Sequence, residues 1–137
     1  MFLGEYIHKL DSKNRIMIPS DFRGDLTGDF YLTKGPEKSL LVYTEEEFQK
    51  RSAALDQLVY ENKKNRAIKR LFFSSTVKVN LDKQGRILIN KSLKDYAAIS
   101  DEAMIIGNNT IIEIWDKQIW DEYINEVEVN LSDIMDE

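Results

Sequence analysis

The sequence contains no cysteine and a single histidine, and these shortages exclude several kinds of chemistry. Without thiols the chain has no disulfide scaffold, no thiolate metal site and no cysteine nucleophile. The longest apolar runs fall well short of the roughly 18 residues that a membrane-spanning helix requires, and the N-terminus lacks the basic and apolar pattern of a secretion signal. We therefore expect a cytoplasmic protein with no membrane segment, no metal site and no cofactor.

The composition is that of an ordinary globular protein. Apolar residues make up 42% of the 137 residues, and aromatic residues are spread from Phe2 to Tyr123, which is not typical of a disordered chain. Because single domains commonly run to about 100–200 residues, this length allows one domain or a tightly packed pair of half-domains.

Charge is unevenly distributed along the chain. The net charge is −5, but residues 1–91 hold 17 Lys and Arg against 12 Asp and Glu, whereas residues 92–137 hold 2 against 12. Screening at physiological salt acts over roughly 8 Å, so a basic face can attract phosphate even when a distant acidic segment sets the total. The alternative is that these charges belong to solvated helices of mixed charge.

An internal repeat organises the chain. Residues 8–26 align with residues 79–97, and the best-matched segments read LDSKNRIMI at 10–18 and LDKQGRILI at 81–89. Leu, Asp, Arg and two Ile recur in register. We divide the chain into a first repeat at 1–50, a helical connector at 51–74, a second repeat at 75–130 and an acidic tail at 131–137.

Each repeat predicts a strand, a turn, a second strand and a short helix. Apolar and polar residues alternate around 6–10 and 76–81, as in half-buried strands, and the runs at 16–18 and 87–89 are short and β-branched. Between them a tight turn is expected, because Asn14 and Gly85 are of residue types that accept a positive φ. A second strand pair follows in each repeat, at 30–33 with 40–43 and at 104–107 with 111–115.

Polar residues mark the expected helix starts. Capping boxes begin at Thr44 and Ser92, Asp116 can cap a third helix, and Pro19 introduces a fourth. Residues 45–73 predict two helices that meet near 59–62, the second of them rich in Lys and Arg with an apolar side. From residue 131 on there is little to bury, and we expect this tail to fray.

The helix after Asp116 predicts an apolar face rich in aromatic residues. Trp120 and Tyr123 lie on one side of it, and Trp115 precedes it on a strand. Core or subunit packing explains these residues better than a ligand site does. We expect an exposed face too large for a small monomer, and hence a homo-oligomer held by apolar strands and terminal helices.

The doubled Asp-x-x-x-Arg motif in a strand–turn–strand context resembles the signature of the MraZ family, transcriptional regulators related to the AbrB-type swapped-hairpin DNA-binding proteins. Residues 1–6, 66–71 and 112–120 also resemble that family in position, so the likeness covers nearly the whole chain. The repeats differ in two places: Asn14 stands where the second turn has Gly85, and Asn90 stands where the first repeat has Pro19.

The resemblance implies an α+β fold in which two pseudo-symmetric strand–turn–strand–helix repeats form a swapped-hairpin, or double-split, β-barrel decorated with helices. It implies a ring-shaped, octamer-like homo-oligomer that binds double-stranded DNA at the nucleoid. The implied targets are short direct repeats upstream of the division and cell-wall gene cluster that begins with the protein's own gene. It implies no enzyme activity, no catalytic residue and no small-molecule substrate.

The turn residues have chemistry suited to DNA. Arg15 and Arg86 carry a planar fork of donors that matches phosphate, or O6 and N7 of guanine. The other expected DNA contacts lie near the turn tips: Ser12, Lys13, Asn14 and Lys83. The alternative for each Arg is a surface ion pair with the Asp of its own turn, typically worth only about 0–1 kcal/mol.

Asp11, Asp82 and Gly85 are expected to shape the turns. An Asp at this position can accept hydrogen bonds from the turn backbone, or hold the Arg so that it points outward. Gly85 supplies the backbone freedom that a tight reversal needs.

Two other functions are compatible with parts of the sequence. Paired Asp11 and Asp82 could form an aspartic-protease site, but the small-residue turn of those enzymes is missing and flanking lysines favour two ionised carboxylates. His8, the sole histidine, fits a strand position better than the role of a base. An antidote-type protein-interaction module is the stronger rival, because such modules can share the swapped-hairpin fold. They usually carry one hairpin and a long tail, whereas this chain carries two.

Overall fold

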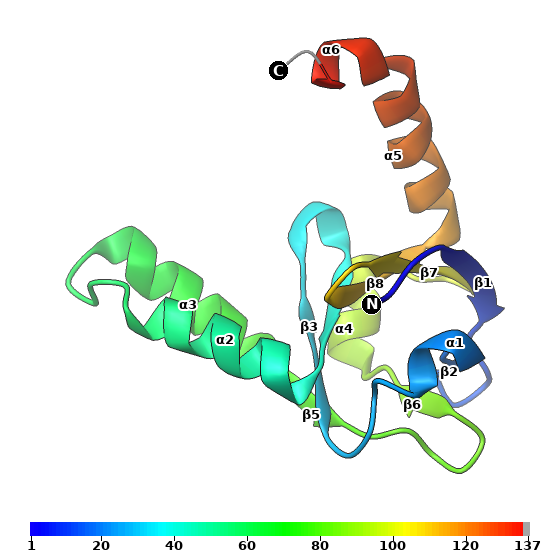
Figure 1. Ribbon diagram of the computed structural model, residues 1–137, viewed down its shortest axis with the longest axis horizontal. Coiled ribbons are helices and arrows are strands. Elements are labelled where there is room, and N and C mark those ends of the chain that lie inside the picture. The colour runs from blue at the N-terminus through cyan, green and yellow to red at the C-terminus, as the bar shows by residue number, and fades with distance from the viewer. Residues whose placement is uncertain (136–137) are drawn as a thin grey trace.

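The structure, a computed structural model, describes residues 1–135 and has the mixed α+β class predicted from the sequence (Figure 1). The strands are β1 (Glu5–Lys9), β2 (Arg15–Met17), β3 (Phe30–Lys34), β4 (Leu40–Tyr43), β5 (Val77–Val79), β6 (Arg86–Leu88), β7 (Glu102–Asn108) and β8 (Ile111–Asp116). The helices are α1 (Ser20–Arg23), α2 (Glu45–Asp56), α3 (Lys63–Ser75), α4 (Lys91–Ala97), α5 (Lys117–Val129) and α6 (Leu131–Met135), with a 3-10 turn at Pro36–Lys38.

The two halves of the chain exchange strands. Six strands form one antiparallel sheet in the order β1-β7-β8-β4-β3-β5, and β2 pairs with β6 in a separate ladder. The hairpins β3–β4 and β7–β8 each lie within one half, as predicted. In contrast, β1 pairs with β7, β5 with β3, and β2 with β6, so the first two strands of each half pair with the other half.

Both halves bury their apolar side chains in one main core. Ile16 and Ile87, which are partners in the β2–β6 ladder, are 0% and 1% exposed, and Phe22 packs edge-on against Phe2 and Tyr6. Successive residues of a strand face opposite sides, so the burial of Ile16 and Ile87 turns the neighbouring residues of β2 and β6 outward. The two halves therefore share one core with the ladder at its surface.

Helix capping agrees with the sequence at two positions and differs at a third. The side chains of Thr44 and Asp116 accept hydrogen bonds from the backbone N–H groups of Glu47 and Ile119. The prediction of a cap at Ser92 was wrong, because the cap of α4 lies two residues earlier: the helix begins at Lys91, and the Asn90 side chain accepts from the Leu93 N–H. Asn90 thus caps α4 two residues after the end of β6.

The predicted helical connector is an arm that projects from the sheet (Figure 1). Its helices α2 and α3 are separated by residues 57–62, close to the predicted junction, and the Asn62 side chain caps α3. Tyr31 of β3 stacks on Phe48 at a centroid distance of 3.9 Å, and Phe48 stacks on Phe72. This aromatic stack anchors the arm to the sheet.

Two expectations for the C-terminal part were wrong. Trp115 and Trp120 are 3% and 9% exposed and pack on each other within the chain, so they do not form an exposed face. Residues Leu131–Met135 form α6 rather than a frayed tail, and the last two residues of the predicted tail lie outside the described part. Helices α5 and α6 form a second projecting arm (Figure 1).

Candidate functional site

The two Asp-x-x-x-Arg turns flank the β2–β6 ladder. Arg15 lies opposite Leu88, and Met17 lies opposite Arg86. Beyond the ladder, the Ile18 N–H donates to the Gly85 carbonyl and the Ile89 N–H donates to the Asn14 carbonyl, both at 2.9 Å. Each turn is therefore hydrogen-bonded to the strand segment of the other repeat, and the two turns form one structural unit.

Within each turn the Asp carboxylate binds the backbone and the Arg together. One Asp11 oxygen accepts from the Lys13 and Arg15 N–H groups at 2.9 Å, and the other accepts from Arg15 Nε at 2.7 Å. Asp82 repeats the pattern with Gln84 and Arg86, at 2.9 Å to both N–H groups and 2.8 Å to Arg86 Nε. The Arg is held by Nε, which leaves the outer nitrogens of its fork for further contacts.

The tip residue of each turn has a positive φ, as the sequence predicted. The φ angle is 60° at Asn14 and 81° at Gly85. Asn is among the few residue types other than Gly that adopt this conformation readily, so both repeats can form the same turn.

Hydrogen bonds keep both turn carboxylates ionised. The backbone N–H of Arg15 is the largest cause that lowers the pKa of Asp11, with smaller contributions from Lys13 N–H and the Arg15 side chain. The backbone N–H of Arg86 lowers the pKa of Asp82 in the same way. The flanking lysines that the sequence suggested are not the main cause, since each Asp is bonded chiefly by its own turn.

The two Arg residues have different surroundings. Arg86 reaches across the ladder, and its Nη1 lies 3.6 Å from Asp11 Oδ2 while its Nε binds Asp82. A cation placed between the two carboxylates stabilises both as anions, which is unlike the shared proton of an aspartic protease. Arg15 pairs with Asp11, within its own turn.

A second pair of basic residues, not predicted from the sequence, contacts the turn tips, each residue reaching the turn of the other repeat. Lys94 of α4 donates to the Asn14 side chain at 3.1 Å, across 80 residues. Arg23 of α1 donates to the Ile18 carbonyl at 2.8 Å, and its guanidinium lies 2.5 Å from the point where a Cβ on Gly85 would stand. Arg23 and Lys94 occupy equivalent positions in the 8–26 and 79–97 alignment, a signal that the sequence did contain.

The outer side of the unit is positively charged and accessible. Arg15 and Arg86 directly precede the buried Ile16 and Ile87, so they lie on the solvent side of the ladder, with 32% and 23% of their side chains exposed. The tip residues Ser12, Lys13 and Lys83 are exposed, and Asn14 is half-buried. These groups can contact a large anionic surface at the same time.

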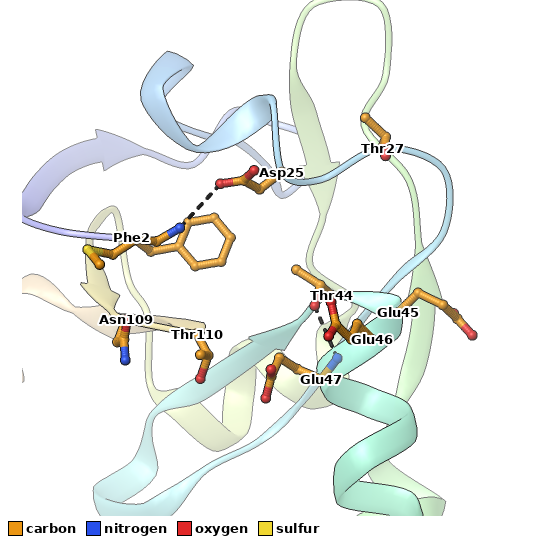
Figure 2. Close-up of a pocket in the computed structure, with 10 residues that line it drawn as sticks. Phe2, Asp25, Thr27, Thr44, Glu45, Glu46, Glu47, Asn109 and Thr110 are labelled. Atoms are coloured by element: carbon orange, nitrogen blue, oxygen red, sulfur yellow. Dashed lines mark hydrogen bonds and ion pairs between the residues drawn. The ribbon is translucent and has the colours of Figure 1, made fainter.

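A hollow of about 440 Å³ lies elsewhere, between the N-terminus and the start of α2 (Figure 2). The Met1 amine lies 3.6 Å from Asp25, and the Thr44 hydroxyl caps α2. The α2 residues Glu45, Glu46 and Glu47 also line it. Helix capping and dipole interactions account for these acidic groups.

In residues 1–135 no group of three or more His, Asp or Glu is arranged to hold a metal, and no helix is long and apolar enough to cross a membrane.

Comparisons with known proteins match the doubled arrangement. The family model described as "MraZ protein, putative antitoxin-like" matches residues 1–71 and, separately, residues 72–137. A protein named "Transcriptional regulator MraZ" from Finegoldia magna is 43% identical over 136 residues, which cover 99% of this chain and 95% of that protein. The two matched segments each contain one of the turns.

Proposed function

Because this chain belongs to the MraZ family, we propose that it is a transcriptional regulator that binds double-stranded DNA through its paired Asp-x-x-x-Arg turns. The observation that carries the proposal is the joining of both turns in one unit that presents Arg15 and Arg86 on its outer side. An Arg side chain that is held through Nε keeps its two outer nitrogens, which can reach guanine O6 and N7 or phosphate oxygens. Ser12, Lys13, Asn14 and Lys83 would add contacts around them.

In this proposal the exchanged strands form the swapped-hairpin barrel of the related DNA-binding proteins. The repeats at 1–50 and 75–130 each supply one turn, and Asp11, Asp82 and Gly85 set its shape. The pairing of β1, β2 and β5 with the opposite half supports this arrangement.

The proposed target is a set of short direct repeats upstream of the division and cell-wall gene cluster, including the protein's own promoter. A ring-shaped, octamer-like oligomer would bring many turns to one face, so that contacts of modest strength add through effective concentration. The protein would then act in the cytoplasm at the nucleoid, without a cofactor and without catalysis.

The direct test is footprinting of the region upstream of the protein's own gene, together with gel-shift titration on the protected repeats. We expect protection of evenly spaced short repeats and no comparable binding to scrambled DNA. The rival is an antidote-type module that binds another protein, consistent with the family description "antitoxin-like". Equal, weak binding to both DNAs would favour the rival and overturn the proposal.

A further inference from the structure

The arm formed by α2 and α3 carries an open apolar groove, here called the arm groove. Its volume is about 330 Å³, and it lies where the arm meets β3, β4 and α4. Its apolar lining includes Leu41, Tyr43, Leu55, Ile68, Leu71 and Phe72. Ile68 and Leu71 are 41% and 57% exposed. Exposed apolar side chains beside an open groove are typical of a protein-binding surface rather than a DNA-binding one.

The charge around the arm groove is positive. Lys34 and Arg51 line it, and among the described residues that line it there is no Asp or Glu. Helix α3 contains five Lys and Arg and no acidic residue. Lys64 stands four residues before Ile68, and therefore on the same helix face. The partner that fits this groove is both apolar and acidic.

The second arm, α5 and α6, has that chemistry. Tyr123, Val129, Leu131 and Met135 are 37%, 76%, 49% and 75% exposed. Residues 118–137 contain seven Asp and Glu and no Lys or Arg. Glu126 borders a small hollow of about 210 Å³ beside Tyr123 and Val127. This arm is anchored through the first half of α5, where Trp120 packs on Trp115 and donates to Glu5. Tyr123 and Ile124 also pack against this tryptophan cluster.

We propose that residues 123–135 of one copy dock into the arm groove of a second copy. The proposal rests on the oligomer proposed above and names the surfaces that would join it. The two arms project in different directions from the sheet (Figure 1), so the groove of a protomer is not occupied by its own C-terminal arm. Groove and arm are different surfaces, which makes the contact heterologous: each copy accepts one arm and offers its own. Contacts of this kind form a ring when the rotation between successive copies closes.

Charge reversal on each surface tests the docking. The first variant is Arg51→Glu with Lys64→Glu, and the second is Glu126→Lys with Glu128→Lys. All four side chains are on exposed residues. Light scattering after size exclusion, at micromolar concentration, should show that each variant falls from the wild-type mass towards the 16.0 kDa protomer. The variant that carries all four changes should recover the oligomer, because it restores opposite charges across the interface.

Arg70→Glu is the matched control. Arg70 is exposed and two residues beyond Ile68, about 200° around the helix from the groove, so its reversal should leave the mass unchanged. An oligomer that survives both double variants, or a folded fourfold variant that stays dissociated, overturns this docking while the proposed oligomer stands. A wild-type protein that is monomeric overturns both.

Cross-linking of the wild-type protein supplies a test that does not depend on variants. A carbodiimide joins an amine to a carboxylate in direct contact. In a mixture of ¹⁴N and ¹⁵N chains, mass spectrometry should find mixed-isotope links between the lysines around the groove, Lys34 and those of residues 63–70, and the acids of residues 123–135. Mixed links confined to other segments overturn the assignment.

Discussion

At the scale of single residues, the two repeats are alike in sequence, but their equivalent Arg residues make different contacts. Among the described residues Arg15 forms an ion pair with Asp11, whereas Arg86 forms ion pairs with both Asp82 and Asp11 and so helps to join the turns. Equivalent positions in a repeat need not contribute equally to binding and to stability, because the surroundings set by the other repeat differ.

Arg15→Ala should therefore abolish specific DNA binding with little effect on the fold. Each base contact is worth roughly 1–3 kcal/mol, and the loss multiplies over the subunits engaged. Arg86→Ala should weaken binding less and lower the unfolding temperature more, since it leaves two carboxylates facing each other without their shared cation. Gel-shift titration and thermal melts of both variants measure this. An Arg15→Ala protein that binds like wild type contradicts the site assignment.

The contact of Arg23 with Gly85 explains why the two turn tips differ. Gly85→Asn suits the positive φ but displaces the Arg23 guanidinium from its bond to the Ile18 carbonyl, and should cost about 1–2 kcal/mol of stability. Adding Arg23→Lys recreates the Lys and Asn pairing of the first turn and should recover most of that loss. Chemical denaturation of both single variants and the double variant gives the coupling energy. Additive effects would show that the two positions are independent.

Acid sensitivity follows from the lowered pKa values of Asp11 and Asp82. Because each folded pKa lies below the unfolded value, the stability that these groups contribute is present above the unfolded pKa and is lost as pH falls through the folded pKa. The unfolding temperature should thus decline below the usual carboxyl pKa of about 4. Asp82→Asn should show a shallower decline over the same pH range. Parallel curves for the variant and wild type would contradict this origin.

At the scale of elements, the short helices depend on their first residues. The Asn90 side chain satisfies the Leu93 N–H at 2.9 Å, while the predicted cap, Ser92, lies inside α4. Sequence patterns placed the helix correctly and its first residue wrongly, because Asn90 and Ser92 are both good caps and only the path of the incoming strand distinguishes them.

Asn90→Ala should destabilise the protein by about 1 kcal/mol, the usual effect of losing a side-chain cap. Ser92→Ala is the matched control and should change stability by less than half as much. Urea denaturation compares the two. A larger effect at Ser92 would return the cap to the position that the sequence suggested.

At the scale of the whole molecule, charge distribution matters more than net charge. The acidic C-terminal arm projects away from the sheet (Figure 1), while the basic residues gather at the turns and on α3. A total of −5 therefore does not prevent an anion from approaching the turns.

Binding to promoter DNA should weaken steeply with salt despite the acidic composition. Each Lys or Arg that replaces a counterion at a phosphate adds to the slope, and about six to ten such contacts reduce affinity by roughly 10³–10⁵ between 50 and 200 mM salt. Fluorescence anisotropy on the cognate repeats over that range measures the slope. A nearly flat dependence would favour the protein-interaction module instead.

The sequence by itself determined the turns and the positions of most helices and strands, because these depend on local chemistry. The positive φ at Asn14 and Gly85, the caps at Thr44 and Asp116, and the two within-half hairpins depend on residues close together in the chain. Such preferences act whatever the rest of the molecule does.

Contacts between distant residues were decided only by the tertiary structure. The exchange of strands between halves, the reach of Arg86 to Asp11 and the contact of Lys94 with Asn14 all exist because one core is closed by both repeats. The burial of Trp115 and Trp120 within the chain was decided in the same way, and it overturned the exposed face that their spacing suggested. A periodic pattern identifies the apolar side of an element but not what covers it, because that depends on packing against residues far away in the chain.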